Sequence, residues 1–340
     1  MRRLSHPQWN SRLKAMAILI VALLLPTFGS AVANSRQEAK AQEGKPQDPK
    51  AQDAKTQESK AQEPKQDEKV DLKHKDEGKL QSKSEKAVDK MFRLQGVILS
   101  PAELLVETTI LAYGGRGPLQ KARATIEEQG TIRLATDQGD ISGKYRMRTI
   151  RKEKSWQDLL RTDLELSLPE SAQKSGAPSS VKYVIAYNGA SVWAAQNNQY
   201  VSPRTEAEAA FRAQLVHEFP ALLRYKEDGS KLELVGPDNV VGLDTNVVEL
   251  TNPDGQKTRF WISTKTYHIL HLEFDLKVGE SPTPGKFRVS YYGFRAIQNT
   301  LVPGRRKMEQ NGKFVQEITI TSFSYGPKLE PEVFQHLQES

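Results

Sequence analysis

Histidine pairs come nearest to a chemical site in this sequence. His268 and His271 stand in an alternating run over residues 267–277, and side chains three apart on a strand point to opposite faces. One ion cannot bind both without a bulge, and His268 is interpreted as a core histidine. His217 and Glu218 close a predicted helix and are interpreted as a surface pair. The pattern predicts no metal site.

Other catalytic patterns are missing from the sequence. There is no cysteine, which excludes disulfides, thiol nucleophiles and thiolate metal sites. No Gly-x-Ser-x-Gly nucleophile elbow and no Walker-type phosphate loop occurs. We therefore predict a protein that is not an enzyme and that uses no cofactor.

The net charge of +7 does not predict a nucleic-acid partner. Four of the 49 basic residues precede residue 34, and the chain contains 42 acidic residues, so the remainder is nearly neutral. A nucleic-acid-binding domain usually carries a concentrated basic surface. One short cluster, Arg305, Arg306 and Lys307, is interpreted as a solvated basic turn.

A row of antiparallel strands over residues 240–306 is the predicted frame for a binding site. Residues 252–255, Asn-Pro-Asp-Gly, predict a hairpin turn, because Pro presets φ and Gly accepts a positive φ. The next two strands alternate between apolar and polar residues. Their apolar face consists of Leu270, Leu272, Phe274, Phe287, Val289 and Tyr291. This pattern is typical of a sheet that is covered on one side.

A helix over residues 101–113 is the predicted cover for this apolar face. Ser100 and Glu103 match a capping box at its start. The helix carries an apolar stripe that consists of Leu104, Leu105 and Leu111. Trp193 and Trp261 lie inside predicted strands, and each fits either a pocket rim or a filled core. The residues alone leave open whether the covered face lines a cavity or is packed solid.

The pattern along the whole domain predicts a mainly β protein of the α+β class. About a dozen antiparallel strands follow two helices, and a third helix over residues 205–219 interrupts them. Tight-turn signals such as Asn188-Gly189 and Asn311-Gly312 join neighbouring strands. Because the alternation continues with short turns throughout, we expect one continuous meander in one domain.

Two segments precede this domain. Residues 1–33 are predicted to be a secretory signal peptide, because basic residues precede a short apolar run that ends in Ala31-Val32-Ala33. Residues 34–86 are rich in Lys, Gln, Glu and Ala, which predicts a disordered low-complexity linker. The folded domain is expected over residues 87–340. The apolar run is too short to span a membrane, so we expect export without stable membrane insertion.

An ordered series of short motifs resembles one family. The first helix ends in Tyr113-Gly114-Gly115, and a strand pair carries Tyr187-Asn188-Gly189 with Trp193 four residues on. Later strands carry Phe260-Trp261-Ile262-Ser263, Thr266-Tyr267-His268-Ile269-Leu270, Tyr291-Tyr292-Gly293-Phe294-Arg295 and Leu301-Val302-Pro303. This order is similar to that of the bacterial LolA-like lipoprotein carriers, a superfamily that includes LolB and RseB.

The resemblance implies a single curved antiparallel sheet that forms an incomplete barrel, with helices over its concave apolar face. It also implies a cavity for acyl chains, which we expect the candidate residues above to line. The resulting prediction is a periplasmic, monomeric carrier or chaperone for lipid or lipoprotein acyl chains. Two alternatives stay open: an RseB-like envelope-stress sensor that acts through an envelope protein partner, and a structural envelope protein without a ligand.

Overall fold

The computed structural model describes residues 74–136, 139–168, 179–203, 205–278 and 283–335. The predicted signal peptide, residues 1–33, and the predicted linker up to residue 73 lie outside the described residues. From Lys75 onward the described chain belongs to one compact unit. The first helix, α1 (His74–Leu94), begins before the domain start predicted at residue 87. Its Lys, Gln and Glu residues favour helix, which accounts for the earlier start.

Two runs of strands follow the first helices. The first run consists of β1 (Thr125–Leu134), β2 (Ile141–Ile150), β3 (Leu159–Ser167), β4 (Ser180–Tyr187), β5 (Val192–Gln196) and β6 (Gln199–Val201). The second run consists of β7 (Lys231–Val240), β8 (Leu243–Thr251), β9 (Lys257–Ser263), β10 (Ile269–Leu276), β11 (Gly285–Tyr292), β14 (Arg305–Gln310) and β15 (Lys313–Tyr325). A separate short pair, β12 (Arg295–Ile297) and β13 (Thr300–Val302), lies between β11 and β14 in the chain.

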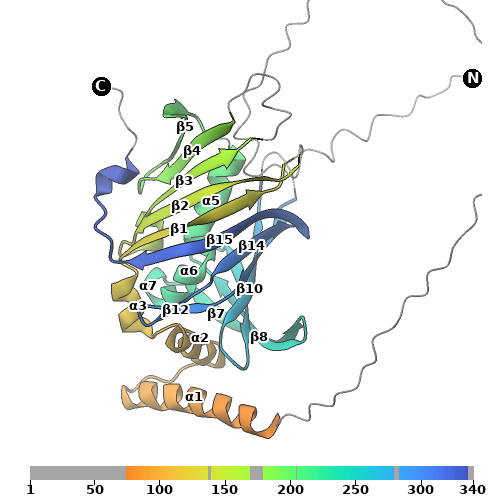
Figure 1. Ribbon diagram of the computed structural model, residues 1–340. Coiled ribbons are helices and arrows are strands. Elements are labelled where there is room, and N and C mark those ends of the chain that lie inside the picture. The colour runs from red at the N-terminus through yellow and green to blue at the C-terminus, as the bar shows by residue number, and fades with distance from the viewer. Residues whose placement is uncertain (1–73, 137–138, 169–178, 204, 279–282, 336–340) are drawn as a thin grey trace, which may run out of the picture. The chain divides into compact units, whose positions relative to one another are not determined.

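In the described part of the chain these two runs form one antiparallel sheet of 13 strands. Its order is β6-β5-β4-β3-β2-β1-β15-β14-β11-β10-β9-β8-β7. Each run is a meander, and the last strand, β15, returns to pair with β1. The end strands β6 and β7 do not pair with each other, so the sheet curves without closing (Figure 1). The predicted incomplete barrel is confirmed.

Predicted turns and caps are found where the residue types require them. Ser100 Oγ accepts a hydrogen bond from the backbone N–H of Glu103, and Glu103 Oε2 accepts one from the backbone N–H of Ser100 at 2.8 Å. Gly255, in the turn between β8 and β9, has a φ of 80°. Asn311 and Gly312 both have positive φ and join β14 to β15. These local signals fix the connections, as expected for primed and capped turns.

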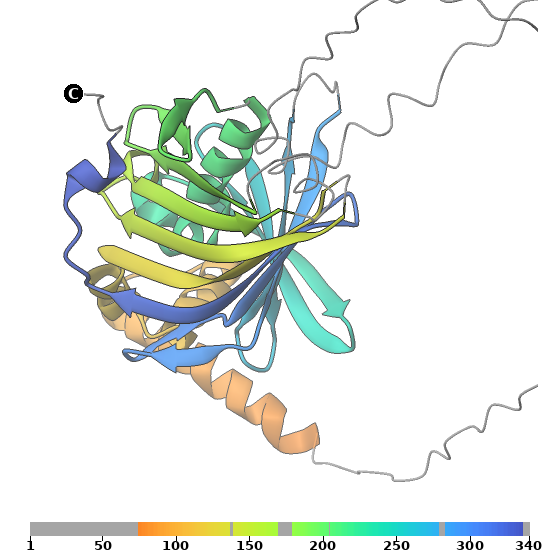
Figure 2. The same ribbon diagram turned by 45° about the horizontal axis from the view of Figure 1, so that its top comes forward.

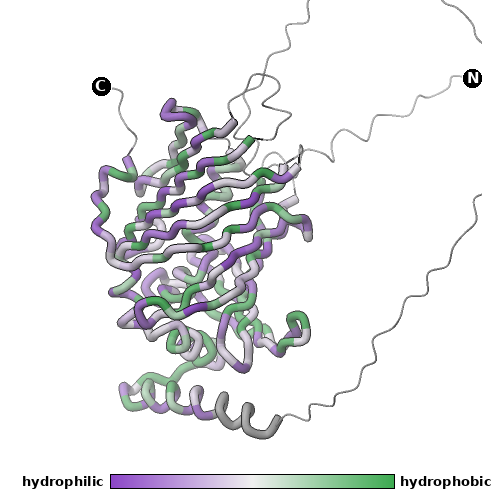
Figure 3. Tube along the Cα trace, viewed as in Figure 1, coloured by the Kyte–Doolittle hydropathy of each residue, from purple (hydrophilic) through white to green (hydrophobic). Residues whose placement is uncertain are grey.

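Helices lie inside the curve of the sheet (Figure 2). They are α2 (Pro101–Ala112), α3 (Arg116–Ala122), α5 (Thr205–His217), α6 (Phe219–Leu223) and α7 (Tyr225–Asp228). Two 3₁₀ turns, η3 (Ser155–Gln157) and η4 (Pro331–Phe334), complete the elements, and η4 lies on the other side of the sheet. Apolar and polar residues alternate along the strands (Figure 3), so one face of the sheet turns to the helices and the other to solvent. We call these the inner and the outer face.

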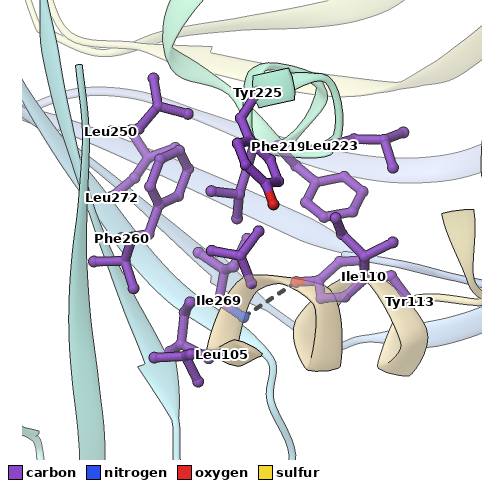
Figure 4. Close-up of a cluster of buried hydrophobic side chains, with 14 of the residues drawn as sticks. Leu105, Ile110, Tyr113, Phe219, Leu223, Tyr225, Leu250, Phe260, Ile269 and Leu272 are labelled. Carbon is purple, nitrogen blue, oxygen red and sulfur yellow. Dashed lines mark hydrogen bonds between the residues drawn. The ribbon is translucent and has the colours of Figure 1, made fainter. Parts of the chain in front are cut away.

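Two apolar clusters fill the space between the inner face and the helices. The first packs α2, α6 and α7 against β8 to β11 and includes Leu105, Phe219, Tyr225, Phe260 and Leu272 (Figure 4). The second packs α5 against β1 to β5 and β15, with Phe211 and Leu215 on the helix side. In the first cluster the Tyr113 hydroxyl accepts a hydrogen bond from the backbone N–H of Ile269 at 3.2 Å.

Candidate functional site

Five of the predicted cavity residues lie in the packed first cluster. Leu105, Leu272, Phe274, Phe287 and Val289 are all buried there, and Leu272 is 0% exposed. The rings of Phe274 and Phe287 stack with centroids 5.5 Å apart. This part of the inner face is therefore a filled core. A ligand role for these five residues stays a prediction.

A cavity lies instead beside the second cluster, between α5 and the inner face of the first meander. We call it the α5 cavity, and its volume is about 60 Å³. Its lining residues are Ile132, Tyr145, Thr162, Leu164, Tyr183, Ile185, Ala207, Ala210, Phe211, Gln214, Met308, Gln316 and Ile318. Most of this wall is apolar, and it combines strands β1 to β4, β14 and β15 with one face of a single helix.

Small residues on α5 leave this space unfilled. Ala207 and Ala210 line the cavity together with Phe211, whose larger side chain also packs in the second cluster. The wall also carries the hydroxyl of Tyr183, whose oxygen is buried and makes no hydrogen bond to any described residue. Burial raises the pKa of Tyr183, so the hydroxyl keeps its proton. The cavity thus offers mostly apolar walls and a few polar side chains, among them Tyr183.

A second cavity of about 60 Å³ lies on the same inner face, and we call it the Arg123 cavity. Its lining residues are Tyr113, Arg123, Ile126, Glu128, Met147, Arg151, Glu218, Phe219, Pro220, Ile269, Tyr291, Phe294, Val302, Pro303, Arg306 and Phe323. Tyr291 is the one predicted cavity residue that lines either space. This cavity differs from the α5 cavity because three arginines and two glutamates stand among its apolar residues.

A buried ion pair separates the two cavities. Arg306 Nη2 donates to Glu128 Oε1 at 2.5 Å and to the Tyr145 hydroxyl at 3.0 Å, and Glu218 lies 3.8 Å from Arg306 Nη1. Burial opposes the charge on Arg306, but Glu128, Tyr145 and Glu218 outweigh burial and raise its pKa. The predicted solvated basic turn is thus wrong for Arg306, because β14 directs this side chain to the inner face.

Asp158 is a second buried carboxylate, and it pairs with Arg151 of the Arg123 cavity. Asp158 is 0% exposed and lies 2.7 Å from Arg151 and 2.7 Å from Arg224. Its Oδ1 also accepts the backbone N–H of Lys152 at 2.7 Å. Two guanidinium groups and a backbone donor compensate the burial of this charge.

Arg123 follows the end of α3 and is buried without a carboxylate partner. None of the ion pairs between described residues includes Arg123, and its Nε makes no hydrogen bond. The guanidinium carbon lies 4.7 Å from the centre of the Phe219 ring, and Tyr325 provides the nearby hydroxyl. Burial lowers the pKa of Arg123, as expected when a cation leaves water.

The remaining predicted site residues lie away from both cavities. Leu104 is half-buried, and Leu111 is 51% exposed because the inward face of α2 consists of Leu105, Val106 and Ile110. Leu270 lies outside the first cluster. A bulge between Ile269 and His271 makes Leu270 the extra residue, so Ile269 replaces it in the core.

Both tryptophans lie on the outer face, where they pack against other side chains and line neither cavity. The Trp193 indole donates to the backbone oxygen of Phe334 at 2.8 Å, and Phe334 is fully buried. The Trp261 indole donates to Asp238 Oδ2 at 2.7 Å and stacks on His271. Strand alternation explains this placement, because the neighbours of each tryptophan in sequence point inward.

The histidines form no metal site among the described residues. No group of three His, Cys, Asp or Glu side chains there is arranged to hold an ion. His217 is buried at 2% exposure, and its Nδ1 lies 2.7 Å from Thr258 Oγ1, so the predicted surface pair is wrong. His268 is half-buried beside Phe294. His271 lies on the outer face.

Of the helices that the structure describes, none combines the length and the apolar composition needed to cross a membrane.

Comparisons with known proteins give structural neighbours only. No family model matches the chain, and no curated protein matches it. An outer membrane lipoprotein-sorting protein domain from Vibrio parahaemolyticus is 14% identical, with a TM-score of 0.42, and the match covers 66% of this chain and 97% of that one. A DUF1329 family protein from Desulfovibrio piger is 12% identical, with a TM-score of 0.45 and coverages of 70% and 98%.

A LolA superfamily protein from Nitrosomonas europaea is 17% identical, with a TM-score of 0.41, and the match covers 65% of this chain and 96% of that one. At these identities and scores the neighbours carry no argument about ligand or partner. The Nitrosomonas europaea protein is named as a member of the LolA superfamily, which the sequence motifs resemble.

Proposed function

We propose that this protein is an exported binding protein that carries the acyl chain of a lipid or lipoprotein in the α5 cavity. The observation that carries the proposal is the unfilled apolar space between Ala207 and Ala210 of α5 and the inner face of β1 to β4. Protein interiors normally pack without such gaps, and an empty apolar cavity destabilises the fold. An acyl chain is a ligand that such a wall fits.

The cavity must enlarge before it can hold a chain. Its volume of about 60 Å³ is far below the roughly 300–1,000 Å³ of a typical small-molecule pocket. The sheet walls are held by strand pairing on both sides, whereas no backbone hydrogen bond between described residues joins α5 to them. We therefore propose that α5 moves away from the sheet as the chain enters. Each CH₂ group that leaves water then contributes about 0.8 kcal/mol to binding.

Export is part of the same proposal. The predicted signal peptide at residues 1–33 supports delivery to the periplasm. The part of the predicted linker that precedes α1 would hold the binding domain at a distance from a surface.

Filling the cavity with a side chain of the protein tests the binding site. The Ala210→Phe variant should keep its fold and bind cis-parinaric acid, a fluorescent fatty acid, at least tenfold more weakly than the wild type. The matched control is Ala209→Phe, on the same helix, because Ala209 lines neither cavity. Circular dichroism melting verifies that both variants fold. Equal probe affinity in wild type, Ala210→Phe and Ala209→Phe would contradict the proposal.

A further inference from the structure

The charges that line the Arg123 cavity do not all have partners. Arg151 is engaged by Asp158, and Arg306 is engaged by both Glu128 and Glu218. Arg123 is the third guanidinium of this wall, and among the described residues no carboxylate lies within ion-pair distance of it. A buried cation without a counter-ion costs free energy, so natural proteins seldom retain one without a use.

Arg123 is also held in a fixed place. It is 9% exposed, and its guanidinium lies over the Phe219 ring at 4.7 Å and near the Tyr325 ring at 5.9 Å. The Tyr325 hydroxyl accepts a hydrogen bond from Thr300 Oγ1 at 2.9 Å, which fixes the tyrosine in turn. Aromatic rings hold a guanidinium by its flat face, so its N–H groups can still donate from the edge. The Tyr325 hydroxyl is one hydrogen-bond partner of this edge, whereas Nε makes no hydrogen bond.

The Arg123 cavity and the α5 cavity lie along the same two strands. On β1, Ile126 lines the Arg123 cavity and Ile132 lines the α5 cavity. On β2, Met147 lines the Arg123 cavity and Tyr145 lines the α5 cavity. The side chains of Glu128 and Arg306 are the partition between the two spaces. A ligand with an apolar tail and a polar end could therefore reach both cavities once the Glu128 and Arg306 side chains move aside.

We propose that the ligand is a free fatty acid or a similar monoanionic amphiphile, whose carboxylate pairs with Arg123 while its chain occupies the α5 cavity. The proposal rests on the proposed function and specifies the head group. One unpaired cation matches one negative charge, and the two glutamates of the wall oppose a doubly charged phosphate. A guanidinium edge binds a carboxylate through two parallel N–H···O hydrogen bonds. The roughly 60 Å³ of the Arg123 cavity suits a group of this small size.

The test compares cis-parinaric acid with its methyl ester, which has the same chain but no charge. Wild-type protein should bind the acid at least tenfold more tightly than the ester, a difference of about 1.4 kcal/mol. Arg123→Met keeps an unbranched apolar stem and removes the charge. It should bind the acid about tenfold more weakly and bind the ester as the wild type does. Arg133→Met, at a half-exposed site on β1, is the control for loss of one positive charge.

The outcomes separate the two proposals. If wild type binds acid and ester equally, the head-group proposal is overturned and the acyl-chain proposal stands. If wild type binds neither probe, the acyl-chain proposal fails as well. If Arg123→Met does not fold, the preference of the wild type for acid over ester still decides, as does Arg123→Lys, which should keep most of that preference. An equal loss of acid binding in Arg133→Met would also contradict a specific role for Arg123.

Discussion

The imidazole of His217 lies flat on the ring of Phe274, with centroids 4.1 Å apart and 3° between the planes. The contact joins the end of α5 to the first apolar cluster, because Phe274 belongs to β10 and stacks in turn on Phe287. His217 is almost fully buried, and its Nε2 makes no hydrogen bond to a described residue. An uncharged ring fits this place, whereas a protonated ring would bring a charge into an apolar stack.

This contact predicts a loss of stability in mild acid. Burial lowers the pKa of His217 from 6.5 to about 4, so between these two pH values the unfolded chain binds a proton that the folded chain does not. The contribution of His217 to the free energy of unfolding should therefore be constant above pH 6.5 and fall by about 3 kcal/mol as the pH drops toward 4. Urea denaturation at several pH values measures the decrease, and His217→Leu should reduce it.

His271 provides the comparison for this experiment, because burial also lowers its pKa to about 4. His271→Leu should remove a separate part of the same decrease. A pH dependence that is identical in the wild type and in both variants would contradict the assignment.

The same substitution at two leucines of α2 should change stability by different amounts. Leu105→Ala removes a side chain that is buried in the first cluster and should lower the free energy of unfolding by roughly 2–5 kcal/mol. Leu111→Ala removes a side chain that is 51% exposed and should change it by about 0.5 kcal/mol or less. Chemical denaturation of both variants tests whether the first cluster is a packed core. Equal effects would show that the helix faces the sheet differently.

The stability of the fold should depend strongly on the buried carboxylate of Asp158. Asp158→Asn keeps the shape but leaves Arg151 and Arg224 without their counter-ion, so it should cost roughly 3–5 kcal/mol of stability. Asp140→Asn is the control, because Asp140 pairs with Arg133 at 3.5 Å and both side chains are about half exposed. That exposed pair should contribute less than about 1 kcal/mol. A small effect of Asp158→Asn in urea denaturation would contradict the burial of this network.

The turn η4, near the C-terminal end of the described chain, should stabilise the fold through its contacts with the sheet. Phe334 is fully buried on the outer face, where its backbone oxygen accepts the Trp193 indole N–H and Arg161 donates to the oxygen of Val333. Phe334→Ala should cost roughly 3–5 kcal/mol and shift tryptophan fluorescence to longer wavelength. Glu332→Ala, at an exposed site in the same turn, should leave both properties unchanged. An unshifted spectrum in Phe334→Ala would count against this contact.

Local signals in the sequence predicted most of the fold. The capping box at Ser100, the turn at residues 252–255 and the Asn311-Gly312 turn each depend on a few neighbouring residues, and the structure has them in place. Regular alternation also predicted the strands and the sheet class. These features are set by backbone geometry that the residue types themselves determine.

The candidate site was predicted less well, because it depends on contacts between distant segments. A single bulge moves Leu270 out of the core, and the neighbouring residue types do not indicate a bulge. Trp193 is covered by Phe334, which lies 141 residues away in the chain. The small residues Ala207 and Ala210 signal a gap only when the sheet opposite them is known. Arg306 stands in a basic run, which predicts an exposed side chain. Its partner Glu128 is distant in the sequence, so the buried ion pair could not be predicted.

The most direct measurement for the central claim is photo-crosslinking with a palmitate analogue that carries a diazirine at the end of its chain. Peptide mapping by mass spectrometry should place the label on α5 near Ala210 and on the inner-face residues of β3 and β4, such as Leu164 and Ile185. The label should disappear when excess palmitate is added and in the Ala210→Phe variant. Labelling that is confined to outer-face peptides around Trp261, or that persists in Ala210→Phe, would contradict the account.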